Sequence, residues 1–337
     1  MRHRTALGCV LLPALFASTP VLADQPILTE WEVPYSSSRP RDPYVDASGI
    51  VWFVGQNGDY VASFDPKTEA FHRFSLEDGA GPHNLIVAGN DTIWYAGNRA
   101  MHIGRLNAND GSIHTIMMPD KKAWDPHTLV FDTAGDIWFT VQGGNFVGKL
   151  TIADETVRLI PIPSRGARPY GINIAGDRAV WVSLFGTNKL ARIDPDTFEL
   201  TEVVLPRADA RPRRLEITAD GLVWYVDYAK GYLGRLDPAT GAIAEWPAPS
   251  GGDSRPYGME VDNRERIWFV ESGPQPNLFV GFDTKTEAFV ASVEIESGGG
   301  TVRHMHYDLA TNSVSSIIKD DGIAHSGEVS PGDPEGL

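Results

Sequence analysis

Seven positions along the chain carry a side chain that can hydrogen-bond a ligand, and six of them directly follow a proline. Proline fixes the backbone angle ahead of these side chains, so we expect all of them to point in the same direction. Tyr, His and Arg favour a ligand with carboxylate, phosphate or many carbonyl oxygens. The alternative is that they only cap neighbouring strands or hold water. We expect a substrate-binding funnel formed by Tyr44, His83, His127, Tyr170, Arg213, Tyr257 and Arg303.

Three further residues are candidates for catalysis: Glu271, His304 and His306. Glu271 follows Tyr257 by 14 residues, and a carboxylate beside Tyr and Arg can serve as a metal ligand or a proton-transfer group. It can equally pair with a nearby arginine. His304 and His306 alternate on one expected strand, so their side chains share a face. They form either a metal-binding pair or a channel residue beside a buried, hydrogen-bonded histidine.

These residues must be positioned by a repeat, because an aliphatic-Trp-aromatic pattern recurs along the chain. The six Trp residues are 42 to 44 residues apart, which is the period of a four-stranded propeller blade. Turns such as Asp-Gly and Asp-Pro separate short apolar runs, as expected for hairpins. The members of the repeat are Trp52, Trp94, Trp138, Trp181, Trp224 and Trp268.

The two ends of this repeat are expected to complete one another. Residues 27–34 resemble an outer fourth strand without a blade of its own, and residues 301–329 resemble the inner strands of a further blade. Pairing them would close the ring and remove its open edges. We therefore predict an all-β, seven-bladed propeller of four-stranded antiparallel blades, closed by an N-terminal strand that completes the seventh blade. In that blade the Trp position falls near Ser313 or Val314.

The first residues are typical of an export signal. A basic start precedes the apolar stretch 6–16, and the small-residue site Val21-Leu22-Ala23 follows it. The stretch is too short to span a bilayer as a helix. We expect a signal peptide over 1–23, the propeller over 24–329 and a disordered tail over 330–337. The mature protein would be periplasmic or secreted, and it would lack the single cysteine, Cys9.

The formal net charge is −15, from 29 basic and 44 acidic residues. This balance argues against general binding of nucleic acid or anionic membranes. We expect a monomer whose partner is a small polar or anionic molecule, or a cyclic peptide, in the central channel.

The repeat resembles the streptogramin (virginiamycin B) lyase family over about residues 27 to 310. The resemblance rests on the Pro-His/Tyr start, the Trp-Phe centre and the Ile-Gly-Arg third strand, as in His83, Trp138-Phe139 and Ile103-Gly104-Arg105. It implies a carbon–oxygen lyase that opens a cyclic depsipeptide at its ester by elimination. It also implies a magnesium ion and a general-base histidine.

The family pattern opens the last blade with Glu-x-His and ends its second strand with another Glu. Here those positions are Thr301-Val302-Arg303-His304 and Ile317, and Glu271 matches the second Glu one blade early. The resemblance thus implies metal-assisted opening of a cyclic ester, with Glu271 as the metal ligand and His304 or His306 as the base. The alternative is a non-catalytic periplasmic propeller that binds a ligand or partner.

Overall fold

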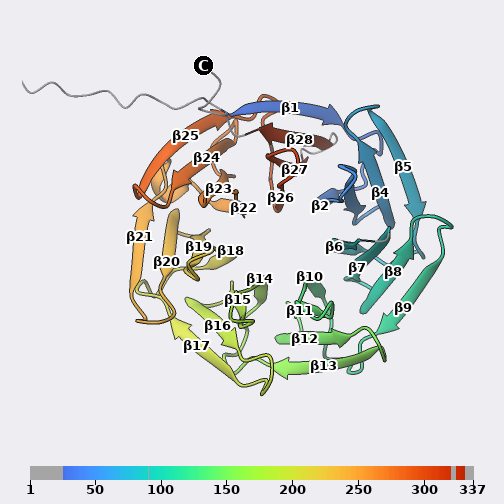
Figure 1. Ribbon diagram of the computed structural model, residues 1–337, viewed down its shortest axis with the longest axis horizontal. Helices are drawn as coiled ribbons and strands as arrows, with labels where there is room; N and C mark the ends of the chain where they lie inside the picture. The colour runs from blue at the N-terminus through green and yellow to red at the C-terminus, as the bar shows by residue number, and fades with distance from the viewer. Residues whose placement is uncertain (1–25, 90, 320–323, 331–337) are drawn as a thin grey trace, which may run out of the picture.

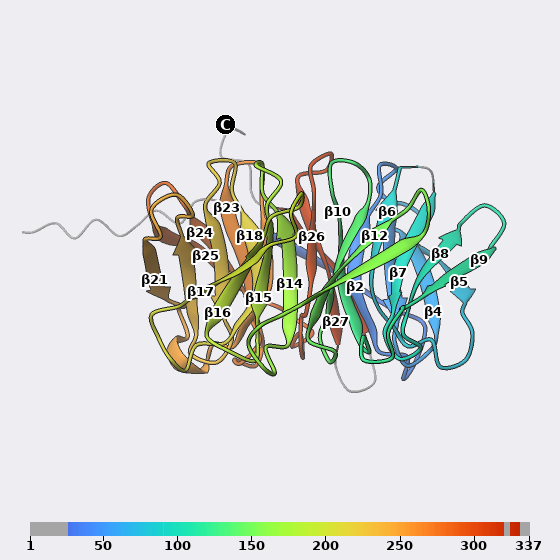
Figure 2. The same ribbon diagram turned by 90° about the horizontal axis from the view of Figure 1, so that it is seen from below.

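The protein was analysed as a computed structural model, which describes residues 26–89, 91–319 and 324–330. Four-stranded antiparallel sheets are arranged as a ring around a central axis (Figure 1). Seen from the side, the strands run between the two faces of a disc (Figure 2). The innermost strand of each sheet faces the axis and lines a channel.

Six of the sheets are complete blades, each formed by four consecutive strands. The first three blades contain β2 (Pro40–Val45), β3 (Val51–Gly55), β4 (Tyr60–Asp65) and β5 (Ala70–Ser75); β6 (Pro82–Ala88), β7 (Thr92–Gly97), β8 (His102–Asn107) and β9 (Ile113–Met117); and β10 (Pro126–Phe131), β11 (Ile137–Val141), β12 (Phe146–Thr151) and β13 (Thr156–Pro161). The next three contain β14 (Pro169–Ile174), β15 (Val180–Leu184), β16 (Lys189–Ile193) and β17 (Leu200–Val204); β18 (Pro212–Ile217), β19 (Val223–Asp227), β20 (Tyr232–Leu236) and β21 (Ile243–Pro247); and β22 (Pro256–Val261), β23 (Arg266–Glu271), β24 (Leu278–Asp283) and β25 (Ala288–Glu294).

The remaining four-stranded sheet is composite, with the order β1-β28-β27-β26. It joins β1 (Ile27–Glu32) to β26 (Met305–Asp308), β27 (Ser313–Lys319) and β28 (Ala324–Ser330). β1 pairs with β28 in antiparallel register, from Ile27 opposite Ser330 to Glu32 opposite His325. The expectation of seven blades is therefore corrected to six complete blades and one composite closing sheet, because that sheet takes its strands from both ends of the chain.

The repeated Trp residues pack between neighbouring blades and are at most 6% exposed. Trp138, for example, belongs to an apolar cluster with Ile172 and Val180 of the next blade. Its indole Nε1 donates a hydrogen bond to Asp132 in the turn after β10. In the composite sheet Ser315 occupies the Trp position, opposite His306. The Trp residues thus hold the ring together and leave the chemistry to the inner strands.

Each inner strand of the six complete blades begins with proline and then changes register. In β6, Pro82 pairs with Gly97 and Leu85 pairs with Tyr95, with an irregularity between the two pairs. A bulge of this kind re-aims the side chains within it. The two residues after each proline therefore come to lie at the axis, where the candidate site is found.

The predicted signal peptide 1–23 lies outside the described residues, as does the predicted tail 330–337 apart from Ser330. Across the part of the chain that is described, no helix is long and apolar enough to cross a membrane.

Candidate functional site

The end of the channel at which the inner strands begin is called the mouth here. It is formed by the first and second residues after the strand-initial prolines, together with Arg303. Each of these prolines lies 12 residues before the Trp of its blade, as Pro82 does before Trp94. The ring residues at the mouth are His83, His127, Tyr170, Arg213 and Tyr257, all of which were predicted from the sequence.

One predicted member of this set, Tyr44, lies elsewhere. In β2 the strand-initial proline is Pro40, which pairs with Gly55, and Tyr44 pairs with Trp52 further along the strand. The position at the mouth is therefore occupied by Arg41. Tyr44 instead stacks on His306 with 4.1 Å between the ring centroids. The assignment of Tyr44 to the mouth was wrong because Pro43 imitates the start of the repeat.

A buried carboxylate stands at the axis. The Oδ1 atom of Asp42 accepts a hydrogen bond of 3.1 Å from Arg41 Nε, and its Oδ2 atom lies 3.3 Å from Arg214 Nη2. Asn84 Nδ2 donates to the same Oδ2 atom at 3.2 Å. Burial alone would raise the pKa of Asp42, but the guanidinium groups of Arg41 and Arg214 outweigh it and hold the pKa below its usual range. Asp42 therefore stays ionised.

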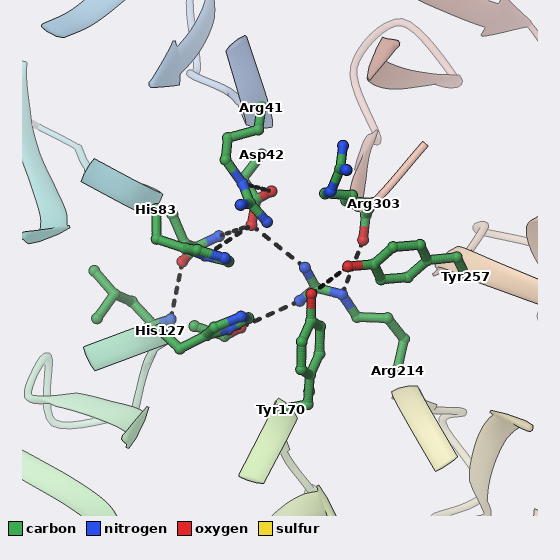
Figure 3. Close-up of polar contacts among 12 residues, drawn as sticks. Arg41, Asp42, His83, His127, Tyr170, Arg214, Tyr257 and Arg303 are labelled. Atoms are coloured by element: carbon green, nitrogen blue, oxygen red, sulfur yellow. Dashed lines mark hydrogen bonds and ion pairs between the residues drawn. The ribbon is translucent and has the colours of Figure 1, made fainter. Parts of the chain in front are cut away.

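Arg214 crosses the channel and ties several segments together (Figure 3). Its Nε donates to the carbonyl oxygen of Arg303 at 3.1 Å, and its Nη1 lies 3.4 Å from Thr128 Oγ1. With the Asp42 contact, this one side chain links β18 to β2, β10 and the segment before β26. The Arg214–Asp42 pair therefore forms a polar partition across the channel.

A row of aromatic and imidazole rings lines one side of the mouth, as Figure 3 shows. The ring centroids are 3.6 Å apart for His83 and His127 and 4.2 Å apart for His127 and Tyr170. The hydroxyl groups of Tyr170 and Tyr257 share a short hydrogen bond. Four blades thus present hydrogen-bonding side chains to one shared space.

The two tyrosines differ in acidity. Burial would raise the pKa of Tyr170, but Arg213, Arg214 and Arg41 lower it to about 8. Burial and the neighbouring Tyr170 raise the pKa of Tyr257 above its ordinary value. Tyr170 is therefore the phenol that ionises first, and Tyr257 then donates to its oxygen.

The histidines of the mouth are neutral bases. Burial, followed by the positive field of Arg41, lowers the pKa of His83 and of His127 well below the ordinary value. Burial and Arg214 lower the pKa of His304 to about 3. His83 Nδ1 and His304 Nδ1 are buried and have no hydrogen-bond partner among the described residues. His83 Nδ1 lies 4.0 Å from Asp42 Oδ2 and so faces the buried carboxylate.

Guanidinium groups dominate the charge at the mouth. The Arg213 guanidinium lies 3.7 Å from the ring centroid of Tyr257 and 4.3 Å from that of Tyr228. Burial lowers the pKa of Arg303 and of Arg39, and the neighbouring Arg41 lowers both further. Arg213 Nε and Arg39 Nε are buried without a hydrogen-bond partner in the described part of the chain. Five arginines (Arg39, Arg41, Arg213, Arg214 and Arg303) therefore lie at the mouth, and Asp42 pairs with two of them, Arg41 and Arg214.

Glu271, the candidate metal ligand, is fully buried and serves the fold. Its Oε1 accepts a 2.9 Å hydrogen bond from the backbone of Ser250, and its Oε2 accepts the Ser250 hydroxyl. These bonds anchor the segment before the 3₁₀ helix η1 (Gly251–Asp253). No described contact joins Glu271 to His304 or His306, so the structure does not bring the three together.

The residues at the mouth do not fit a magnesium ion. Mg²⁺ needs oxygen ligands in octahedral geometry, and Asp42, the carboxylate here, is already paired with Arg41 and Arg214. No group of three or more His, Cys, Asp or Glu residues suited to a metal is found in the described ranges. The cation that the family resemblance implies would also be repelled by the surrounding guanidinium groups.

Arg41 and Arg214 were not predicted from the sequence, although a sequence pattern places each of them at the axis. The constant spacing of 12 residues from proline to Trp selects Pro40 in the first blade and so places Arg41 at the mouth. Arg214 is the second residue after Pro212, a position that the bulge also turns toward the axis.

Three comparisons place the chain among known proteins. The sequence profile of the Virginiamycin B lyase family matches residues 25–284. No curated protein matches the sequence. A structure described as streptogramin B lyase has 25% sequence identity and a TM-score of 0.80, covering 90% of this chain and 98% of its own.

Two further structures share the fold. Virginiamycin B lyase from Staphylococcus aureus has 22% identity and a TM-score of 0.81, with 91% of this chain and 100% of that chain covered. The extracellular domain of a putative hybrid two-component system from B. thetaiotaomicron has 16% identity and a TM-score of 0.67, with 90% and 43% covered. On the extent of the sequence match, the chain belongs to the virginiamycin B lyase family.

Proposed function

We propose that this member of the family binds a small molecule bearing a carboxylate or phosphate group at the channel mouth. The observation that carries the proposal is the excess of guanidinium groups over carboxylates around a half-buried space. Arg213 and Arg303 remain partly exposed, so they can be reached from solvent. Charge-assisted hydrogen bonds from arginine to such oxygens are among the strongest polar contacts that a protein makes.

The groups around Arg213 and Arg303 strengthen the preference for an anion. The pKa of Arg303 is lowered by burial and by the neighbouring Arg41, so an anion would relieve mutual repulsion. The neutral His83 adds an uncharged hydrogen-bonding atom beside the guanidinium groups. The rings of Tyr228 and Phe185 contact each other and Arg213, and supply an apolar wall. Such a mixture of apolar walls and a few convergent polar groups is typical of small-molecule sites.

Titration calorimetry with citrate, inorganic phosphate and magnesium chloride tests this proposal. We expect citrate or phosphate to bind, and the substitution Arg213→Gln to weaken binding about tenfold. Arg178→Gln is the matched control, because Arg178 is half-exposed and pairs with Asp196 on the surface. Binding of magnesium without any anion binding would reject the proposal.

A second candidate function is elimination without a metal, favoured by the lowered pKa of Tyr170 (about 8). The Tyr170 phenolate would take the proton from the carbon next to the ester-bearing carbon. The C–H electron pair would form the carbon–carbon double bond, and the C–O bond would break to release a carboxylate. Arg213 and Arg214 would stabilise that leaving carboxylate. This is the elimination that the family resemblance implies, carried by guanidinium groups in place of magnesium.

Incubation with virginiamycin B, followed by chromatography and mass spectrometry, tests this candidate. Ring opening by elimination adds no water, so a new peak of unchanged mass is expected, both with EDTA and with added magnesium. Tyr170→Phe should abolish the peak, whereas Tyr35→Phe, at a ring that packs on Phe71 of the outer strand β5, should leave it unchanged. An intact antibiotic after long incubation, or activity that EDTA removes, would reject metal-free elimination.

We further propose that the protein acts outside the cytoplasm. The expected signal peptide 1–23 and the likeness to an extracellular domain support this placement. Osmotic-shock fractionation of cells that express the full chain with a C-terminal tag tests it. Release of a shortened protein is expected, and a full-length cytoplasmic product would contradict the proposal.

A further inference from the structure

Beyond the Arg214–Asp42 partition, the opposite end of the channel contains a second cavity, of about 340 Å³. It is called the lower cavity here. Its walls come from the distal halves of the inner strands β2, β6, β10, β14, β18, β22 and β26. The residues that matter for its chemistry are Tyr44, Phe131, Asn173, Glu216, Glu260 and His306.

Two glutamates face this cavity from neighbouring blades. Glu216 pairs with Trp224 and Glu260 pairs with Trp268, so they occupy equivalent positions on β18 and β22. Glu216 accepts a 2.7 Å hydrogen bond from Asn173 Nδ2. Burial raises the pKa of Glu216 to about 8. Burial and the adjacent Glu216 raise the pKa of Glu260 well above its ordinary value, although backbone groups of Val261 and Tyr307 bond to it.

No ion pair of Glu216 or Glu260 is found within the described residues. Arg214 also lines the cavity and favours the ionised glutamates, but its nitrogen atoms are engaged by Asp42, Thr128 and the Arg303 carbonyl. His304 and His306 are uncharged at neutral pH, since burial first and foremost lowers their pKa values to about 3 and 4. The pair is therefore left to hold protons or to receive a cation from outside.

Much of the remaining wall is apolar or aromatic, beside the polar side chains of Thr128, Arg214 and His304. Tyr44 stacks on His306, and Leu129 and Phe131 add apolar surface. A metal ion would find few ligands here, because Ca²⁺ takes six to eight oxygen atoms and Mg²⁺ takes six in octahedral geometry. Within the described ranges no three His, Cys, Asp or Glu residues come together for a metal. An organic cation with a short apolar chain matches both the carboxylates and the walls.

We infer that the lower cavity is a second binding site, which accepts a primary alkylammonium ion between Glu216 and Glu260. The ammonium group donates to the two carboxylates, and the alkyl chain packs on Tyr44 and Phe131. Binding releases the protons that the glutamic acids hold at neutral pH. The inference stands apart from the proposed function, because it uses no residue that would contact the anion at the mouth.

Titration calorimetry with n-butylamine, in two buffers of different ionisation enthalpy, tests this inference. The affinity should rise from about pH 6 to about pH 9, because Glu216 ionises in that range while the amine stays protonated. The two buffers should report proton release on binding. n-Butanol, which has the same chain without the charge, should not bind.

Substitution separates the cavity from the rest of the protein. Glu260→Gln should weaken n-butylamine about tenfold or more, whereas Glu199→Gln removes an exposed carboxylate and should change nothing. Arg213→Gln, which disables the mouth, should leave the amine affinity unchanged. Thermal melting of each variant shows that it is folded.

Three results would overturn the inference. They are no heat with n-butylamine at either pH, equal binding by folded Glu260→Gln, or binding of calcium chloride in preference to the amine.

Discussion

The two ends of the channel have opposite chemistry, although the same seven strands build both. On β18 the residues after Pro212 are Arg213 and Arg214 at the mouth and Glu216 in the lower cavity. On β22 the corresponding residues are Tyr257 and Glu260. A shift of two or three residues along one strand therefore changes an arginine-rich environment into an acidic one. The Arg214–Asp42 pair separates them, so each end can keep its own charge.

The comparison shows how the repeat creates a site. The turn-and-Trp framework is nearly constant around the ring, and it fixes where each inner strand starts and bends. The residues at that bend differ from blade to blade, which gives an asymmetric mouth. Function in such a fold depends on the unlike residues that the framework brings to the axis.

Removing the partition should have the largest effect. Asp42→Asn leaves Arg41 and Arg214 buried without their counter-ion. We expect a loss of about 3 to 5 kcal/mol in the free energy of unfolding, measured by urea denaturation. The control Asp196→Asn breaks a surface pair with Arg178 and should cost about 1 kcal/mol or less. Equal stability of the two variants would show that the partition is not structural.

Glu216 in the lower cavity should make the protein less stable at alkaline pH. The folded-state pKa of Glu216 is about 8, above its unfolded value of 4.5. Its contribution is therefore complete below about pH 4.5 and is lost as the pH rises through about 8. Glu216→Gln removes that loss, and we expect a gain of about 2 kcal/mol over the wild type near pH 9. Urea denaturation at several pH values checks this, and a variant that loses stability as steeply as the wild type would contradict it.

The buried His304, between the mouth and the lower cavity, should make the protein less stable in acid. The folded-state pKa of His304 is about 3, below its unfolded value of 6.5, so the unfolded chain takes up a proton first. The stability from the neutral imidazole is complete above pH 6.5 and falls steadily as the pH drops toward 3. Between about pH 6 and pH 4, His304→Asn should lose about 1 kcal/mol less free energy of unfolding than the wild type. An unchanged slope in the same denaturation series would argue that His304 charges freely in the folded protein.

The smallest effect on stability, about 1 kcal/mol, is expected for Tyr170→Phe, which loses one hydrogen bond with Tyr257. Its signature is spectroscopic. Ultraviolet difference titration of the wild type should show one phenol ionising near pH 8, because Arg213 and its neighbours lower the pKa of Tyr170 to about that value. The variant should lack this step. Retention of the step in Tyr170→Phe would assign it to another tyrosine.

The sequence was sufficient for the framework but less so for the channel. The spacing of Trp residues predicted the six complete blades, and residues 27–32 do pair with the C-terminal strands. The prediction of seven like blades was wrong, since Ser315 replaces the Trp in the closing sheet and the strands of that sheet come from both ends of the chain. Tyr44 was misplaced because Pro40 and Pro43 both precede suitable residues; the spacing of 12 residues to Trp52 selects Pro40, and the bulge in β2 agrees with it.

Burial and pairing explain the remaining differences between the sequence predictions and the structure. Glu271 carries the charge that a metal site needs, but its two hydrogen bonds to Ser250 are tertiary contacts that no local pattern reveals. Glu216 and Glu260 resemble ordinary strand carboxylates in the sequence, and only closure of the ring places them in one cavity. Arg41 and Arg214 likewise become partners through Asp42, which lies 172 residues from Arg214 in the chain.

Anomalous X-ray diffraction from crystals soaked separately in sodium selenate and in manganese chloride tests the central claim most directly. Selenate stands in for a carboxylate or phosphate ligand, and manganese stands in for magnesium. We predict an anomalous peak for selenate at the mouth, beside Arg213 and Arg303, and no manganese peak there. A manganese ion bound at the mouth, with no selenate, would contradict the account.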